Sequence, residues 1–133
     1  MRVMIVDNDE AWTRSLEILL RQRGYDVVAF TEPECACDFI DQVHATGGLG
    51  TDNEPDAVVL DYVMPRMTGL GVLAQISSEL KPSCVVVFVT GHGDQLLSAD
   101  LAQMGVAACL EKPVDVDDLI KVLEGKAHVQ KAS

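Results

Sequence analysis

Residues 3–10 read V-M-I-V-D-N-D-E, a short apolar run that passes directly into acidic residues. The apolar run has the length of a short buried strand, and residues 10–23 repeat apolar side chains, from Trp12 to Leu20, at helical spacing. Gly24 follows as a C-terminal cap, because glycine readily adopts the left-handed backbone conformation that ends many helices. This stretch therefore predicts a strand followed by an amphipathic helix.

The alternation of apolar runs and amphipathic segments continues through the rest of the chain, a pattern typical of a parallel sheet with helices on both faces. The predicted strands are residues 3–6, 26–30, 57–60, 84–89 and 107–110. The predicted helices are residues 10–23, 33–44, 70–80, 95–104 and 115–123. We therefore expect an α/β fold, in which a doubly wound, flavodoxin-like sheet of five parallel strands in the order 2-1-3-4-5 has five flanking helices.

Local signals set the boundaries of several segments. Thr31 is a candidate cap for the helix of residues 33–44. Residues 46–55 combine Gly, Thr, Asn and acids without periodicity, which predicts an exposed and poorly ordered loop. We expect one domain over residues 1–124 and a frayed tail over residues 125–133.

The composition narrows the class of protein. The net charge of -11 argues against DNA or an anionic membrane as the main partner, because both attract clustered Lys and Arg. No signal-peptide pattern and no apolar run of roughly 20 residues occurs, so a soluble, cytoplasmic protein is expected. The cysteines lack zinc-ligand spacing and are expected to pack as small, reduced apolar side chains. They are Cys35, Cys37, Cys84 and Cys109.

Polar residues follow the predicted strands at the edge where sheets of this kind bind ligands. The residues at the four strand ends are Asp7, Asn8 and Asp9, then Asp61, then Thr90 and Gly91, then Lys112 and Pro113. Neighbouring carboxylates repel each other unless a cation joins them, and oxygen ligands favour a hard ion such as magnesium. The pattern therefore predicts a magnesium site at this edge.

Asp61 is the candidate nucleophile of such a site. A carboxylate beside a divalent ion and a lysine can attack phosphorus and form an acyl phosphate, while Lys112 neutralises charge on the transferring oxygens. Each residue also has a simpler interpretation: the acids could cap a helix, Thr90 could begin a turn, and Lys112 could be solvated. Their joint placement favours the functional interpretation.

In four segments the chain resembles the response regulator receiver family. The matching segments are V-M-I-V-D-N-D-E, V-V-L-D-Y-V-M-P-R-M-T-G, V-T-G-H-G-D and L-E-K-P-V-D, and the resemblance runs over about residues 3–123. It implies a bacterial two-component switch in which a histidine kinase or phosphotransfer protein donates a phosphoryl group to Asp61. It also implies output to a downstream protein through the fourth helix, fifth strand and fifth helix.

The resemblance also implies roles for individual residues. The magnesium ligands would be Asp7, Asn8, Asp61 and the backbone carbonyl of Val63. Thr90 matches the hydroxyl that turns toward the phosphoryl group, and Lys112 matches the lysine that pairs with that group. Asn8 stands where the family usually has a second acid, and Cys109 where it usually has Tyr or Phe.

Two other classes of function stay open at this point. The first is a pseudo-receiver, an interaction module that binds its partners without phosphorylation, which the departures at Asn8 and Cys109 favour. The second is a magnesium-dependent phosphatase, which needs an acid two residues after its nucleophile, where this chain has Val63. We expect a switch rather than an enzyme, with at most self-phosphorylation and self-dephosphorylation. Whether it forms a phosphorylation-dependent homodimer, or is part of a longer regulator, is left open.

Overall fold

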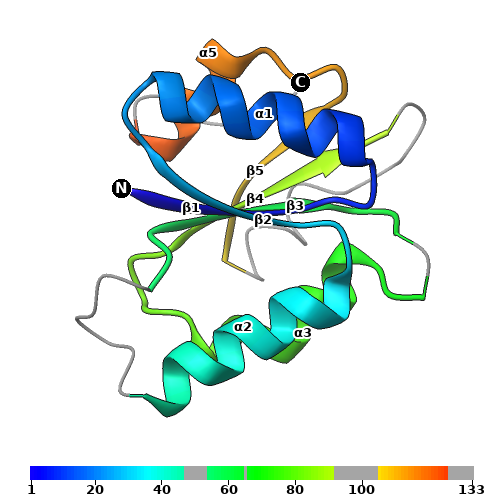
Figure 1. Cartoon of the computed structure of the whole chain (residues 1–133), viewed down its shortest axis with the longest axis vertical. Helices are drawn as coiled ribbons and strands as arrows, with labels where there is room; N and C mark the ends of the chain where they lie inside the picture. The colour runs from blue at the N-terminus through cyan, green and yellow to red at the C-terminus, as the bar shows by residue number, and fades with distance from the viewer. Residues whose placement is uncertain (47–53, 65, 92–104, 126–133) are drawn as a thin grey trace.

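The computed structural model describes residues 1–46, 54–64, 66–91 and 105–125. Its strands are β1 (Arg2–Val6), β2 (Asp26–Phe30), β3 (Ala57–Asp61), β4 (Val85–Thr90) and β5 (Val106–Glu111). Its helices are α1 (Glu10–Gln22), α2 (Pro33–Ala45), α3 (Gly69–Ile76), the 3-10 turn η1 (Ser77–Glu79) and α5 (Val116–Leu123). Figure 1 shows three layers, with α1 and α5 on one face of the sheet and α2 and α3 on the other.

The sheet has the predicted topology. Its five strands are ordered β2-β1-β3-β4-β5, and each neighbouring pair is parallel. This arrangement confirms the doubly wound, flavodoxin-like fold class. The helix expected over residues 95–104 lies outside the described part of the chain, so the expected count of five helices stays a prediction.

Both faces of the sheet are buried, because successive strand residues point to opposite sides. The side chains under α2 and α3 form one core, which includes Met4, Val6, Ile40, Leu60, Ile76 and Phe88. Those under α1 and α5 form the other, which includes Val3, Ile5, Leu16, Leu20, Val59 and Leu119. Apolar side chains thus cover both faces of the sheet. The polar residues of the candidate site lie at the ends of the strands.

The cap of one helix and the end of another differ from the prediction. α2 begins at Pro33 as expected, but Thr31 was the wrong cap, because Glu32 stands at the capping position and its side chain makes no capping hydrogen bond. The helix expected over residues 70–80 ends as an α-helix at Ile76 and continues as the 3-10 turn η1. At the end of α1, Gly24 has the expected left-handed backbone (φ +92°) and donates its N–H to the carbonyl of Arg21.

The expectation of an exposed loop over residues 46–55 was only partly right. Thr46 is exposed, but Glu54 and Pro55 are buried where the chain enters β3, with Glu54 only 6% exposed. The backbone at Asp56 already bonds to the neighbouring strand, which draws these residues against the sheet. Residues 47–53, which carry the rest of this expectation, lie outside the described residues.

None of the four cysteines forms a disulfide within the part of the chain that the structure describes, and they are not equally buried. Cys37 is buried, Cys84 and Cys109 are partly buried, and Cys35 is exposed on α2. The expectation of packing was therefore wrong for Cys35, because that position faces away from the core side of the helix.

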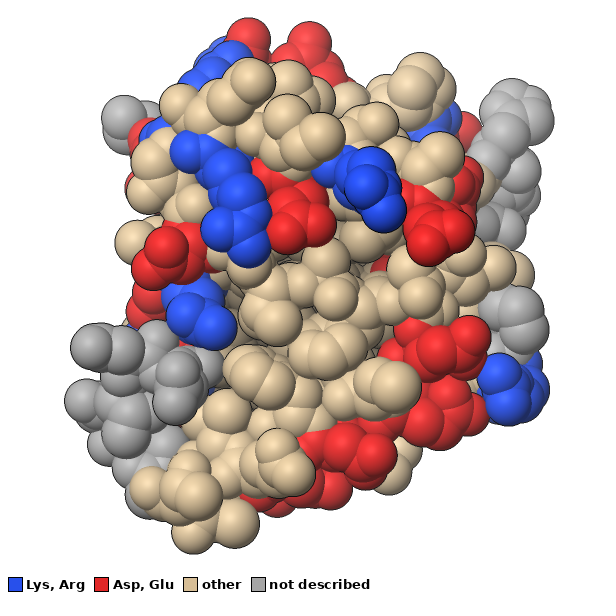
Figure 2. Space-filling model, viewed as in Figure 1, with Lys and Arg blue, Asp and Glu red and all other residues tan. Residues whose placement is uncertain are grey.

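The face formed by α1, β2 and α2 carries charges of both signs (Figure 2). Acidic residues gather over α2 in this view (Figure 2), and Glu34, Asp38 and Asp41 of this helix are exposed. Over α1 basic and acidic residues alternate, and Arg21 pairs with Glu17 at 3.1 Å. Among the described helices, which reach at most 13 residues, none combines the length and apolar character needed to cross a bilayer.

Candidate functional site

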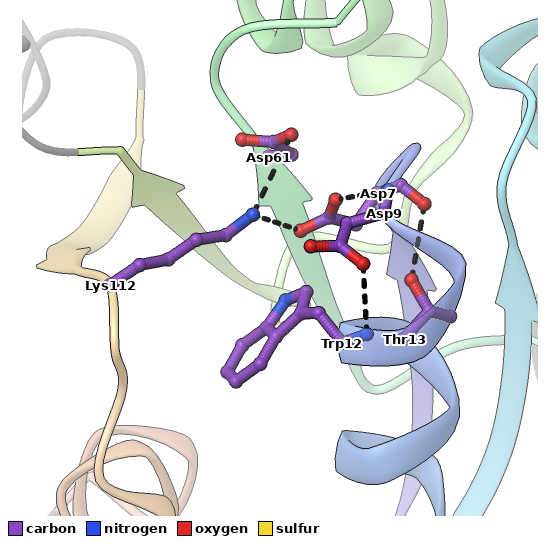
Figure 3. Close-up of polar contacts among 6 residues, drawn as sticks. All are labelled: Asp7, Asp9, Trp12, Thr13, Asp61 and Lys112. Carbon is purple, nitrogen blue, oxygen red and sulfur yellow. Dashed lines mark hydrogen bonds and ion pairs between the residues drawn. The ribbon is translucent and has the colours of Figure 1, made fainter.

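The turn between β1 and α1 fixes the carboxylate of Asp7 at the edge of the sheet. Asp7 is 1% exposed, and its Oδ1 accepts a hydrogen bond from the backbone N–H of Asp9 at 2.8 Å. Its backbone carbonyl accepts a second one from the hydroxyl of Thr13 at 3.1 Å. Asp9 caps α1 by accepting the N–H of Trp12, so capping and the site share one turn (Figure 3). The remaining oxygen of Asp7 points toward β3 and β5.

Lys112 lies between two buried carboxylates. Asp61 is the last residue of β3 and is 5% exposed. The Nζ atom of Lys112 lies 2.8 Å from Oδ2 of Asp7 and 3.9 Å from Oδ2 of Asp61 (Figure 3). When both carboxylates are ionised, these three side chains together carry one net negative charge.

This arrangement changes the acidity of Asp61. Burial, followed by the negative charge of Asp7, raises the pKa of Asp61 from 3.8 to about 6. The positive charge of Lys112 and a hydrogen bond from the backbone N–H of Val63 act in the opposite direction. Asp61 is therefore mostly ionised at pH 7, but its negative charge is incompletely compensated.

The other predicted site residues lie around this group. Thr90 ends β4 and is buried, and its backbone carbonyl accepts the N–H of Lys112 at 2.8 Å. The strand register pairs Asp61 with Val89, so Thr90 lies one residue beyond Asp61 at the same edge. The side chains of Asn8 and Val63 are exposed, the latter by 54%.

The donor set at this edge fits a hard divalent ion. Oδ2 of Asp7 is buried and, in the described part of the chain, has an ion pair with Lys112 but no hydrogen bond of ordinary geometry. A cation there would compensate the excess negative charge. Among the described residues, no group of three or more His, Cys, Asp or Glu side chains could hold a metal. A metal site would therefore combine Asp7 and Asp61 with neutral oxygens, such as the amide of Asn8 and the carbonyl of Val63.

Two further residues, Trp12 and Gly69, lie next to the site, and no role in the chemistry was predicted for either. The ring of Trp12 lies 5.6 Å from Nζ of Lys112, measured to the ring centroid. A Cβ atom at Gly69 would lie 2.6 Å from the backbone oxygen of Asp61, so glycine is needed there for lack of space. In the sequence, the position of Trp12 in the first turn of the helix after Asp7 could have indicated that it lies near the site. For Gly69, the indication was its closeness in sequence to Asp61.

Comparison with known proteins gives a consistent family match. Residues 3–124 match the family described as the response regulator receiver domain. The chain is 34% identical over 134 residues to the tetrathionate response regulatory protein TtrR of Salmonella typhimurium, covering 98% of this chain and 58% of that protein. It is 28% identical over 127 residues to the chemotaxis protein CheY of Listeria monocytogenes, covering 96% of this chain and 98% of that protein.

The fold agrees with solved structures of the same kind. A response regulator receiver protein from Burkholderia phymatum is 27% identical, with a TM-score of 0.72 and coverage of 96% of this chain and 97% of that chain. The chain spans about half the length of several curated relatives, such as 54% of the transcriptional regulatory protein FixJ of Bradyrhizobium diazoefficiens.

Proposed function

The chain belongs to the response regulator receiver domain family of two-component signalling proteins, and from that premise we propose that phosphorylation of Asp61 is its switch. The observation that carries the proposal is the position of Asp61, buried at the end of β3 with Asp7 and Lys112 beside it. Receiver domains are signalling switches rather than classical enzymes, and their partners are histidine kinases or phosphotransfer proteins and downstream effectors.

In the proposed reaction an oxygen of the Asp61 carboxylate attacks the phosphorus of a phosphohistidine on the partner. The new P–O bond forms as the P–N bond breaks, and the imidazole nitrogen leaves with the electron pair and takes a proton from water. The reaction needs the ionised carboxylate, and a pKa of about 6 leaves most of Asp61 ionised at pH 7. That pKa also keeps Asp61 more basic than an ordinary aspartate.

Lys112 and Thr90 are proposed to stabilise the phosphoryl group on Asp61. The ammonium of Lys112 already lies 3.9 Å from Oδ2 of Asp61, so a small movement brings it to an oxygen of the phosphoryl group. Thr90 is buried at the same edge and joined to Lys112 by a backbone hydrogen bond, which couples the two positions. We propose that its hydroxyl turns toward the phosphoryl group.

Receiver domains generally bind Mg²⁺ at their acidic pocket, and we propose the same for this chain. The ligands would be Asp7, Asn8, Asp61 and the carbonyl of Val63. When bound, Mg²⁺ would supply positive charge to the oxygens of the transferring phosphoryl group. Asn8 contributes a neutral oxygen where a second acid would contribute a charge, so we expect weaker magnesium binding than with an acid there.

We further propose that the chain acts in the cytoplasm and passes its signal on through β5 and α5. Phosphorylation adds negative charge next to Lys112, directly after β5, and so changes the end of that strand. The helix that is expected to complete this output surface, over residues 95–104, lies outside the described residues. A homodimer that forms on phosphorylation through the same surface would be one form of output.

Intact mass spectrometry after exposure to acetyl phosphate, with and without Mg²⁺, tests the proposal. We expect one added phosphoryl group that requires Mg²⁺ and is absent in Asp61→Asn. A chain that gains no phosphoryl group under any condition would instead favour the pseudo-receiver, the alternative that Asn8 and Cys109 support. An adduct that persists in Asp61→Asn would place the phosphoryl group on another residue.

A further inference from the structure

Trp12 contacts the pocket from its outer side. The ammonium of Lys112 lies 5.6 Å from the centroid of the indole ring, within the range of a cation–π interaction. Trp12 is half-buried in the first turn of α1, and its backbone N–H is held by the side chain of Asp9. Figure 3 shows the ring below the end of the Lys112 side chain, with Asp61 above the ammonium and Asp7 to its right.

The flexible side chain of Lys112 must be held at the pocket if its ammonium is to contact a phosphoryl group on Asp61. A lysine side chain has a flexible stem and a strongly hydrated ammonium, so it loses conformational freedom when held in one place. Here the ammonium is nearer to Asp7, at 2.8 Å, than to Asp61, at 3.9 Å. Full contact with a phosphoryl group on Asp61 therefore requires the ammonium to move away from its nearest partner.

The indole ring differs from the two carboxylates in one respect that matters for this movement. Its attraction for a cation comes from the ring itself and stays the same when the charges on Asp7 or Asp61 are compensated or altered. Because Trp12 is held in the first turn of α1, the ammonium keeps one constant partner while its anionic partners change. An ammonium without this partner would be freer to turn into solvent.

We propose that Trp12 is a positioning residue, whose indole face keeps the ammonium of Lys112 at the pocket while it moves from Asp7 toward the phosphorylated Asp61. This inference rests on the proposed phosphorylation of Asp61. Since Trp12 is the sole tryptophan of the sequence, its fluorescence also reports the position of the ammonium.

Two substitutions distinguish the effect of the aromatic ring of Trp12 from the effect of its apolar packing. Trp12→Leu keeps an apolar side chain but removes the ring, whereas Trp12→Phe keeps a smaller ring. With acetyl phosphate and Mg²⁺, we expect Trp12→Leu to be phosphorylated about two- to fivefold more slowly than the wild type, with Trp12→Phe recovering most of the rate. Phe39→Leu is the matched control, because it removes a partly buried aromatic residue of α2 that packs on Phe30 instead, and should leave the rate unchanged.

A second readout does not depend on phosphorylation. In protein without phosphodonor, Lys112→Met removes the ammonium but keeps an unbranched side chain, so the emission spectrum of Trp12 should change. Thermal unfolding of each variant shows that it is folded. The proposal is overturned if Trp12→Leu reacts at the wild-type rate, if Trp12→Phe is as slow as Trp12→Leu, or if Lys112→Met leaves the emission unchanged. A wild-type chain that takes up no phosphoryl group would overturn the proposed function itself, a result distinct from all three.

Discussion

Asp7 directly follows β1 and Asp61 ends the neighbouring parallel strand β3, and the negative charge of Asp7 is, after burial, the main reason why the pKa of Asp61 rises to about 6. The two carboxylates face the ammonium of Lys112 together. The pocket of the resting protein is therefore arranged for chemistry rather than for stability.

Asp61→Asn should stabilise the metal-free protein at neutral pH. The folded-state pKa of about 6 exceeds the ordinary 3.8, so the ionised carboxylate opposes folding, and stability is lost as the pH rises through about 6. At pH 7.5 with a chelator, we expect the variant to unfold with a free energy higher by on the order of 2 kcal/mol in urea titrations. The gain should disappear near pH 4. An equal gain from Asp38→Asn, an exposed carboxylate on α2, would contradict the explanation.

The neighbours of Asp61 should shift its titration in opposite directions. Asp7→Asn removes a negative charge and should lower the pKa of Asp61 from about 6 toward 3.8, without reaching it, because burial remains. Lys112→Met removes the compensating positive charge and should raise the pKa of Asp61. NMR titration of the labelled side-chain carboxyl measures both shifts in metal-free protein, and shifts of the same sign would refute the electrostatic account.

Asn8→Asp should strengthen Mg²⁺ binding. The exposed Asn8 lies next to the buried Asp7, and an acid at this position would add a charged oxygen to the proposed ligands. We expect a gain in affinity on the order of tenfold by isothermal titration calorimetry. Gln22→Glu adds the same charge at the far end of α1 and should have little effect. If both variants bind Mg²⁺ equally well, general charge rather than a ligand at residue 8 determines the affinity.

Gly69→Ala should damage the support of Asp61. The added Cβ would lie 2.6 Å from the backbone oxygen of Asp61 and 3.1 Å from the ring of Phe88, neither of which moves easily in a packed core. We expect a loss of about 1–3 kcal/mol in the free energy of unfolding, measured by urea denaturation. Gly71→Ala is the comparison in the same helix, because its Cβ would lie 2.9 Å from Cγ of the Met67 side chain, which can turn aside, and the nearest atoms include no backbone atom. A tolerated Gly69→Ala would show that the β3–α3 connection can shift freely.

The fold and the location of the site were predictable because few folds are compatible with the pattern of the sequence. Alternating apolar and amphipathic segments leave few arrangements besides a parallel sheet covered on both faces, and that sheet gathers the residues after its strands. Asp7, Asp61 and Lys112 meet for this reason. The start of α2 at Pro33 was predicted, but its cap was not, because Glu32 rather than Thr31 stands at the capping position without making a capping hydrogen bond. The burial of Glu54 depended on tertiary contacts that no local pattern encodes. The approach of Trp12 to Lys112 depended on the path of a long side chain, which topology leaves open.

Val63→Asn should shorten the lifetime of the phosphorylated state. The side chain of Val63 stands two residues after Asp61 and is 54% exposed, so it faces the solvent from which an attacking water would come. Valine offers no hydrogen bond to that water, whereas an asparagine amide can hold it near the phosphorus. We expect loss of the phosphoryl group to accelerate several-fold, followed by intact mass after the phosphodonor is removed. Val63→Leu should behave like the wild type, because it changes shape without adding a polar group. An unchanged or slower loss in Val63→Asn would mean that access of water, and not its orientation, limits hydrolysis.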